Sequence, residues 1–208
     1  MKISRISKGL LLTMIFISAS TGNAQEKALD KNRLRVADFS GIELGAVLAT
    51  IAADYSVTIG FEADPNNPRS PIEVRLRDVN FLQLIDGLVK ADRRYEWGDQ
   101  NGFIQVLPAQ HGPSLLNQPV ARFQVKDVNR ELAVNRLFGL PEVQAQAASL
   151  GLKVRTPADA ARDEKLSFDL SGVTVRQVLN QIADQSGARF WIARRFPDGV
   201  YEIKLSCC

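Results

Sequence analysis

The stretch that decides the fold is IEVRLRDVNFLQLIDGL, residues 72–88. Its first part alternates apolar and charged residues, which is the period-2 pattern of a β-strand with one buried face and one face in water. Its second part changes to the spacing of one helix face. The residues of this face are Phe81, Leu84, Ile85 and Leu88. Because Asn80 or Asp78 can cap the start of this helix, the stretch predicts a half-buried strand that turns directly into an amphipathic helix.

The same pattern recurs at three other places in the chain. The copies are FQVKDVN at 123–129, LSFDLSGVT at 166–174 and a looser LRVADFSGI at 34–42, each followed by a helical pattern. Four strand–turn–helix units in a chain of 208 residues indicate an internal duplication. We therefore predict an α+β fold of two tandem small βαββαββ modules, each with two helices packed on short mixed or antiparallel sheets.

Turn and linker signals set the boundaries of the two modules. Module one is expected at 34–107 and ends in a hairpin whose loop contains Asn101-Gly102, a pair that tolerates positive φ. Residues 108–120 contain prolines near both ends and a Gly-Pro pair inside, so they predict a linker. Module two is expected at 121–205, with its first helix interrupted near Pro141. Each module is long enough for a small independent core.

Residues 1–24 have the three parts of a secretory signal peptide. Lys2, Arg5 and Lys8 precede a short apolar run, and small residues lead up to Ala24. The run is shorter than the roughly 20 apolar residues that a membrane span needs, although an uncleaved anchor is the alternative. We therefore expect an exported protein that is located in the periplasm or associated with the outer membrane.

The charge balance argues against a nucleic-acid partner. The whole chain carries 26 basic and 23 acidic residues, and the predicted leader contains three basic residues and no acidic one. Without the leader the chain is close to neutral, so the basic pI of about 9.0 gives no support for nucleic-acid binding.

Cysteine and histidine are too few for a disulfide framework or a zinc site. Cys207 and Cys208 are adjacent, where they either end a free tail or form an intermolecular disulfide. His111 lies in the predicted linker without a neighbour that would make it half of a catalytic pair, so we expect it to be solvated. We expect no metal site.

No catalytic or cofactor-binding motif is present in the sequence. The chain lacks a Gly-rich phosphate loop after a strand, a nucleophile elbow and the helix of a zinc protease. Acidic neighbours such as Asp38 with Glu43, or Asp163 with Glu164, lie at predicted turns and loops, where capping and solvation explain them. We therefore predict a protein that is not an enzyme and holds no cofactor.

Several segments together resemble a known family, the secretin and TonB short N-terminal (STN) domain. The matching segments are LGAVLATIA (44–52) with Val57 and Ile59, VRLRDV (74–79), VLNQIADQSG (178–187) and Phe190. The resemblance covers 34–107 well and 121–205 less closely. It implies a periplasmic protein-binding module. Because no secretin core, plug or barrel follows residue 205, we expect an accessory protein and not the channel itself.

The resemblance implies an adaptor that acts with an outer-membrane secretion system or with TonB-dependent uptake or signalling. Its partner would be a protein of the cell envelope, namely a secretin, a TonB-dependent receptor or an inner-membrane regulator, and it would meet the membrane only through that partner. The alternative is a periplasmic enzyme or small-ligand-binding protein on the duplicated scaffold. A pocket with convergent polar groups between the modules would favour this alternative.

The C-terminal hairpin supplies the candidate partner-binding residues. Both faces of RFWIARRF (189–196) are apolar, so Phe190 or Trp191 faces the other module or a partner. We expect docking by strand addition on a terminal hairpin strand, either Phe103–Leu107 or Tyr201–Leu205. The candidate residues are Trp191, Arg194, Phe196, Tyr201, Glu202 and Ile203.

Overall fold

The computed structural model describes residues 34–206 except for 68, 70, 111 and 157–164. The predicted leader, His111, the Asp163–Glu164 pair and the two C-terminal cysteines lie outside the described residues. The fold is α+β, as the sequence predicts, because helices and strands alternate along the chain and the strands form mixed and antiparallel sheets.

The two halves of the chain have closely similar orders of elements. The first half contains β1 (Leu34–Glu43), α2 (Leu44–Tyr55), β2 (Thr58–Glu62), β3 (Pro71–Val79), α3 (Phe81–Ala91), β4 (Tyr95–Gln100) and β5 (Phe103–Pro108). A single helical turn, η1 (Leu115–Asn117), precedes the second half. That half contains β6 (Pro119–Val128), α4 (Arg130–Phe138), α5 (Pro141–Ser149), β7 (Lys153–Arg155), β8 (Leu166–Thr174), α6 (Val175–Gln185), β9 (Phe190–Arg195) and β10 (Val200–Ser206).

The stretch at 72–88 forms the predicted strand and helix, and a capping box joins them. The Asn80 side chain accepts a hydrogen bond from Gln83 N at 2.8 Å, and the Gln83 side chain accepts one from Asn80 N at 3.0 Å. Thr174 and Gln177 form the same box at the start of α6. Each box satisfies two backbone N–H groups that a helix start would otherwise leave unpaired.

All four strand–turn–helix units share one backbone feature. In each, the residue two positions before the helix N-cap has a left-handed φ between 51° and 73°. These residues are Gly41, Asp78, Asp127 and Gly172. Glycine and aspartate are among the residues that tolerate this conformation. The four segments therefore share a local geometry, while their origin by duplication stays a prediction.

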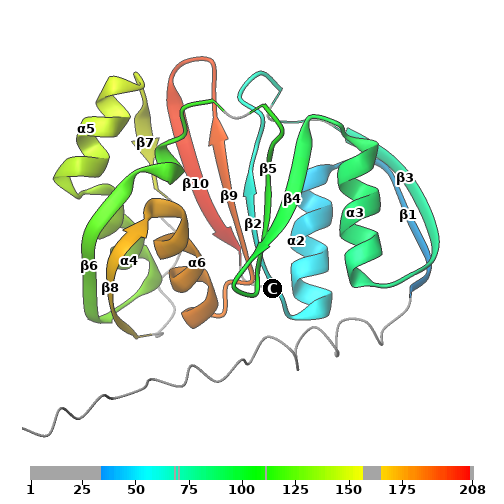
Figure 1. Ribbon diagram of the computed structural model, residues 1–208, viewed down its shortest axis with the longest axis horizontal. Helices are drawn as coiled ribbons and strands as arrows, with labels where there is room; N and C mark the ends of the chain where they lie inside the picture. Colours follow the sequence, from blue (N-terminus) through cyan, green and yellow to red (C-terminus); the bar gives the residue numbers. More distant parts are fainter. Residues whose placement is uncertain (1–33, 68, 70, 111, 157–164, 207–208) are drawn as a thin grey trace, which may run out of the picture.

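One six-stranded sheet runs through both halves of the chain. Its order is β4-β5-β2-β9-β10-β7, so three strands of each half meet at the β2–β9 pair. β5, β2 and β9 are parallel, whereas β4 is antiparallel to β5 and β10 is antiparallel to β9. Figure 1 shows this sheet in the middle of the molecule, with the two-stranded sheets β1–β3 and β6–β8 at the two ends.

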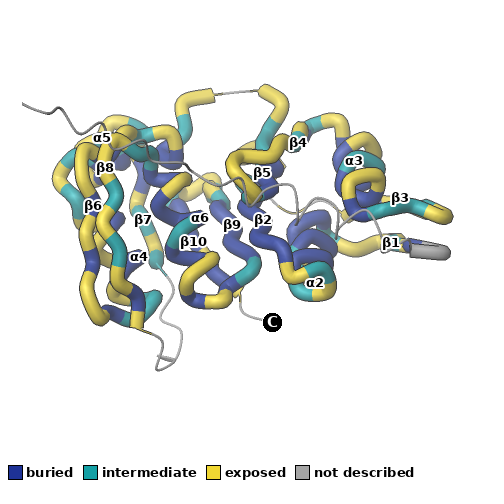
Figure 2. The backbone as a smooth tube through the Cα atoms, turned by 60° about the horizontal axis from the view of Figure 1, so that its bottom comes forward, coloured by how far each residue is buried: buried dark blue, intermediate teal, exposed yellow. Residues whose placement is uncertain are grey.

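The two halves bury their helices against opposite faces of this sheet. β9 shows this directly, because successive side chains of a strand point to opposite faces. Phe190 and Ile192 belong to the first core, the buried cluster that includes the apolar residues of α2 and α3. Trp191 and Ala193 belong to the second core, which includes the apolar residues of α4 and α6. Figure 2 shows the buried backbone concentrated around β2, β9 and the helices that flank them.

The expectation of an independent core is wrong for the first module, whereas the second core contains no residue of 34–107. The first core contains Phe190 and Ile192, which come from the second half of the chain. Removing the second half would therefore expose the β2 edge and leave the first core incomplete. The two halves form one folded unit, although the sequence boundaries 34–107 and 121–205 remain a prediction.

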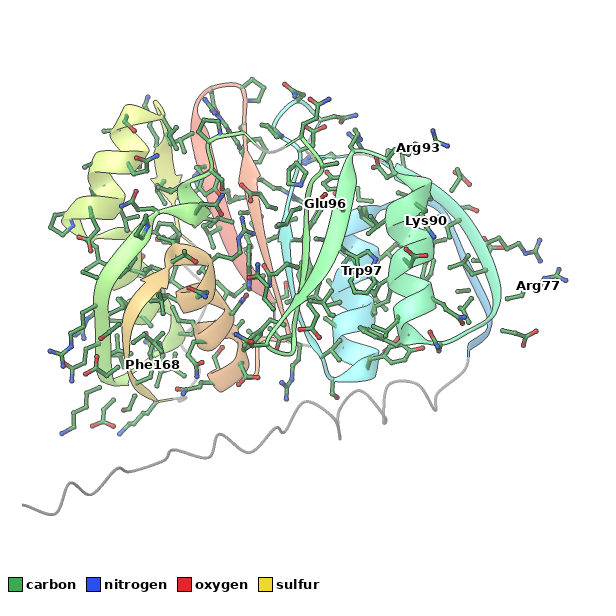
Figure 3. All side chains as sticks on the ribbon, viewed as in Figure 1. Arg77, Lys90, Arg93, Glu96, Trp97 and Phe168 are labelled. Atoms are coloured by element: carbon green, nitrogen blue, oxygen red, sulfur yellow. The ribbon has the colours of Figure 1, made fainter. Side chains whose placement is uncertain are left out.

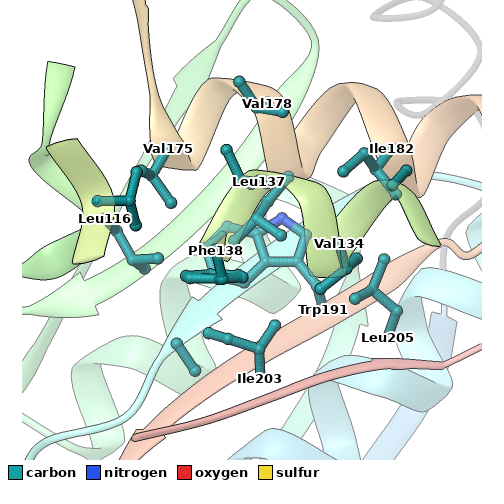
Figure 4. Packing of buried hydrophobic residues seen from close by; sticks show 14 of the residues in the cluster. Leu116, Val134, Leu137, Phe138, Val175, Val178, Ile182, Trp191, Ile203 and Leu205 are labelled. Atoms are coloured by element: carbon teal, nitrogen blue, oxygen red, sulfur yellow. The ribbon is translucent and has the colours of Figure 1, made fainter. Parts of the chain in front are cut away.

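Trp191 lies at the centre of the contact between the halves. Its side chain is fully buried, and Figure 4 shows it among side chains of α4 and β10. Its Nε1 donates to Asn180 Oδ1 at 2.8 Å, and Gln105 Nε2 donates to the same oxygen at 3.1 Å. A Cβ on Gly60 would lie only 2.3 Å from Cζ2 of the indole. Glycine at position 60 is therefore required by the close approach of β2 and Trp191.

Candidate functional site

Three of the residues predicted to bind a partner are buried. Trp191, Tyr201 and Ile203 are each at most 4% exposed and pack into the second core. They cannot form a docking surface in this structure, which corrects the prediction. The physical reason is that β9 and β10 lie inside the six-stranded sheet, where α4 and α6 cover the face that carries these side chains.

The other three predicted residues keep partial exposure but do not gather at one place. Arg194 Nη2 lies 3.3 Å from Glu43 Oε2 on the side of the first core. Glu202 lies 3.4 Å from Lys204 Nζ on β10, and Phe196 begins the turn that joins β9 to β10. The predicted set therefore does not define one site.

Neither predicted docking strand is an outer strand of the sheet. β5 is hydrogen-bonded to β4 on one side and to β2 on the other. β10 pairs with β9 along its length and with β7 over Val200–Glu202. The hairpins are terminal in each half of the sequence, but the strand order places β4 and β7 at the edges of the sheet.

β4 is the longer of these two edge strands. Ala109 N donates to Arg94 O at 2.7 Å, which makes this a hydrogen-bonded pair at the start of the β4–β5 ladder. Hydrogen-bonded and non-hydrogen-bonded pairs alternate in an antiparallel ladder, so the N–H and C=O groups of Trp97 and Asp99 point away from β5. No strand in the described part of the chain pairs with this side of β4. β4 therefore presents a short row of backbone donors and acceptors.

A hollow of about 580 Å³ lies beside this edge, between β4 and α3. Its lining residues are Asp86, Val89, Lys90, Arg93, Tyr95, Glu96 and Trp97. Tyr95 is buried and Trp97 is half-buried, whereas Lys90 and Arg93 are exposed at the rim (Figure 3). Burial raises the pKa of the Tyr95 hydroxyl, which stays protonated and accepts a hydrogen bond from Asp64 N at 3.0 Å. The hollow thus has an aromatic floor and a partly basic rim.

A second space, a cavity of about 620 Å³, lies where β2 and β5 end and the two halves of the chain meet. Its walls come from these strand ends, from the segment between the halves and from the start of α6. The described lining residues are Glu62, Asp64, Pro65, Asn66, Arg93, Arg94, Leu107, Pro108, Ala109, Gln110, Gly112, Pro113, Ser114, Asn117 and Arg176. Its volume falls in the range of small-molecule sites, and ligands commonly bind at the carboxyl ends of parallel strands.

Arg176 and Glu62 form a buried ion pair across the boundary between the halves. Arg176 Nη2 lies 2.6 Å from Glu62 Oε2, and the two side chains are 6% and 14% exposed. Ser114 Oγ donates to the other oxygen of Glu62, and Asn117 Oδ1 accepts from Arg176 Nη2 at 3.3 Å. Burial raises the pKa of the nearby Tyr201 hydroxyl well above its usual value, and the charge of Glu62 adds to this rise. Tyr201 is therefore neutral at any physiological pH.

A second ionic group forms another wall of the cavity. The guanidinium of Arg94 makes a two-pronged pair with Asp92, and its Nη1 lies 3.6 Å from Asp64 Oδ2. The hydrogen bond from Arg94 lowers the pKa of Asp92 below its ordinary value, although burial opposes this shift. The same hydrogen bond raises the pKa of Arg94. Both groups are therefore ionised at neutral pH.

No sequence motif marks Arg176, Glu62 or Arg94 as a buried or functional residue. Arg176 stands between apolar positions of a helix, and its position gives no sign that the side chain is buried. Glu62 ends a β-rich run, where a solvated carboxylate is the usual expectation. The packing of the second half against the end of β2 brings Arg176 to Glu62, and no local pattern encodes that contact. Arg94 instead pairs with Asp92 and Asp64 of its own half.

The described residues contain no cluster of three or more His, Cys, Asp or Glu side chains that could hold a metal ion. In the same part of the chain, no helix is both long enough and apolar enough to cross a membrane. Comparisons of the chain with protein-family models, with curated proteins and with solved structures give no match.

Proposed function

We propose that this chain is a periplasmic adaptor that binds a protein partner of the cell envelope. It acts with an outer-membrane secretion system or with a TonB-dependent uptake or signalling system, and it is not itself an enzyme. The leader-like N-terminus and the STN-like spacing at 34–107 support the location and the class of partner. The free edge of β4 supports the mode of binding.

The partner contributes an extended segment that adds to the sheet beside β4. The outward N–H and C=O groups of Trp97 and Asp99 supply backbone hydrogen bonds to that segment. Its alternate side chains point into the hollow between β4 and α3, where Trp97 provides apolar contact. The main support for this binding mode is that the open edge of β4 lies directly beside the hollow between β4 and α3.

Arg93 offers a contact for an acidic side chain of the partner segment, beside Asp86 and Glu96, which line the same hollow. Lys90 is paired with Asp86 at 2.6 Å, while Arg93 makes no hydrogen bond or ion pair among the described residues. An acidic residue of the partner opposite Arg93 would gain an ion pair at the rim. Such an exposed ion pair increases the specificity and the association rate of binding more than it increases the affinity.

The test compares two substitutions at one position. Trp97→Pro and Trp97→Val both remove the indole, but only proline also removes the outward N–H group. Envelope proteins captured by each variant are identified by mass spectrometry. We expect Trp97→Pro to bind the captured secretin, receptor or regulator at least about tenfold more weakly than Trp97→Val does. In the complex, the amide protons of Trp97 and Asp99 should exchange more slowly with solvent than in the free protein.

Glu96→Pro is the control for folding, because it removes an N–H that points toward β5. It should loosen the β4–β5 ladder, which Trp97→Pro should leave in place, as judged by circular dichroism. Equal binding by the two Trp97 variants, with unchanged exchange at Trp97 and Asp99, would exclude docking at β4.

A further inference from the structure

The two capping boxes show that α3 with β4 and α6 with β9 are equivalent parts of the two halves. A shift of 94 positions carries Asn80 and Gln83 of the first box onto Thr174 and Gln177 of the second. Both helices have 11 residues, and each is followed by the first strand of an antiparallel hairpin. The arrangement around α3 and β4 therefore repeats the arrangement around α6 and β9.

The same shift carries Trp97 onto Trp191 and Asp86 onto Asn180. In the second half this pair is buried, and Trp191 Nε1 donates to Asn180 Oδ1. In the first half Trp97 is half-buried and lines, with Asp86, the hollow between β4 and α3. The two halves differ in what lies beside the tryptophan. β9 pairs with β2 on the side away from β10, whereas no strand of the described residues pairs with the corresponding side of β4.

β2 shows what fills this position in the second half. It runs parallel to β9 and places Gly60 opposite Trp191. The glycine allows the indole to lie against the backbone of β2, since a Cβ at position 60 would be 2.3 Å from Cζ2 of the ring. The neighbours Ile59 and Phe61 point to the other face of the sheet and belong to the first core.

The backbone groups of β4 match the ladder that β2 forms with β9. N–H groups at β2 donate to the carbonyl oxygens of Arg189 and Ala193, each at 2.9 Å. The shift carries Tyr95 and Asp99 onto these two residues. Their carbonyl groups point away from β5, because hydrogen-bonded and non-hydrogen-bonded pairs alternate along the β4–β5 ladder. β4 therefore offers acceptors at the positions that a parallel strand needs.

We propose that the hollow beside β4 receives an edge strand of a partner protein in the way that α6 and β9 receive β2. The strand runs parallel to β4, and a glycine of the partner lies against the indole of Trp97. The two residues that flank this glycine are apolar, point to the opposite face of the sheet and belong to the partner's own core. This inference rests on the proposed docking at β4 and specifies the strand that docks there.

Among the strands of the described residues, a second copy of this chain offers no such strand. Its β2 is already paired on both sides, with β5 and β9. The other edge strand of the sheet, β7, has three residues and no glycine, and Lys153 and Arg155 carry charges. The partner is therefore a different protein, whose edge strand has a glycine between two apolar residues.

The test uses two peptides and the full chain. One peptide has the sequence of residues 57–64, which includes β2, and the other is the same peptide with Gly60→Val. Binding is followed by two-dimensional NMR of the backbone amides and the indole N–H groups. We expect the first peptide to cause saturable shifts at Trp97 and Asp99, and the second to bind at least about tenfold more weakly. Valine favours strands more than glycine does, so this loss would come from the contact with Trp97.

Two protein variants locate the contact. In Trp97→Ala the valine no longer meets an indole, so the two peptides should bind with similar affinity. Arg77→Gln, on the separate two-stranded sheet (Figure 3), should keep the full preference for glycine. Circular dichroism checks that both variants are folded.

A nitroxide label on the peptide tests the direction of the strand. For a parallel strand, a label at the N-terminus of the peptide should broaden the signals near Tyr95, where β4 begins. A label at the C-terminus should broaden those near Gln100, where β4 ends. The opposite pattern would mean an antiparallel strand and would contradict the inference.

Other results would also overturn the inference. One is the absence of a saturable shift at Trp97 with millimolar peptide, and another is equal binding of the two peptides to the unchanged protein. A preference for glycine that persists in Trp97→Ala would place the contact elsewhere. In each case the proposed function would still stand if a captured envelope protein slows amide exchange at Trp97 and Asp99. If no captured protein does so, docking at β4 fails whatever the peptides show.

Discussion

Gly60 shows at the scale of one residue how closely the two halves pack. A methyl group added there would lie 2.3 Å from Trp191 Cζ2 and 2.8 Å from Gln105 Oε1. Trp191 is fully buried and held by its hydrogen bond to Asn180, so the ring has little room to move. The contact is made by atoms that no local sequence pattern could have paired.

We expect Gly60→Ala to lower the free energy of unfolding by about 3 kcal/mol, because the added methyl group overpacks a filled core. The measurement is urea denaturation followed by tryptophan fluorescence. Gly98→Ala is the matched control, since it also places alanine in a strand but meets no atom within 4 Å. It should change stability by no more than about 0.5 kcal/mol. Equal effects of the two substitutions would contradict the close approach at Gly60.

Asp92 gives the protein an acid-sensitive contribution to stability. Its pKa is lowered in the folded state by the hydrogen bond from Arg94, so the unfolded chain binds more protons once the pH falls to about 4. This contribution is fully present at neutral pH and is lost as the pH falls below the ordinary value for aspartate. Asp92→Asn should therefore lower stability at pH 7 and flatten its decline in acid. Parallel pH profiles of the two proteins, from urea denaturation at several pH values, would argue against this role.

The residues that shape local turns could be predicted from sequence, while those that join the halves could not. The cap at Asn80 and the hairpin loop at Asn101-Gly102 both occur as expected, because each depends on neighbours within a few positions. Arg176 and Glu62 are 114 positions apart, and their pairing depends on the strand order of the whole sheet. The buried ion pair of Arg176 and Glu62 could not be predicted from the sequence for that reason.

At the scale of elements, the period of the apolar residues identifies strands and helices but not their neighbours. The alternation in β3 and the helix face in α3 appear as predicted, since both report which side of one element is buried. Of the two strands of this hairpin, the one that does not pair with β2 forms the edge of the sheet. The apolar pattern of β5 would be the same at the edge or next to β2, so it does not show which strand is the edge. Neither predicted docking strand, Phe103–Leu107 or Tyr201–Leu205, therefore lies at an edge of the sheet.

The sequence of β9, with apolar residues on both faces, predicted a contact between elements that lie far apart in the chain. Apolar residues on both faces predicted that Phe190 or Trp191 would face something beyond its own module, and the structure shows that the other half fills this role. A partner was the competing interpretation. Sequence alone could not decide between them, because a buried face is equally apolar whether the same chain or another chain covers it.

At the scale of the molecule, the continuous sheet makes the two halves depend on each other. A protease site inserted after Gln110, in the exposed segment between the halves, should yield two fragments that stay together. The β2–β9 ladder and the packing of Phe190 and Ile192 in the first core hold them. We expect the cut protein to elute as one species in size-exclusion chromatography. The fragment that ends at Gln110, made alone, should show the exposed apolar surface of a partly folded protein. Two separately folded fragments would instead restore the view of independent modules.

The place of β9 in the sheet also sets an order of events during synthesis. The ribosome completes β2 long before Phe190–Arg195, so the growing chain carries an open strand edge for most of its elongation. An open, apolar strand edge is a template for pairing with other chains. The edge of β2 is therefore covered only once β9, one of the last strands in the sequence, has folded against it.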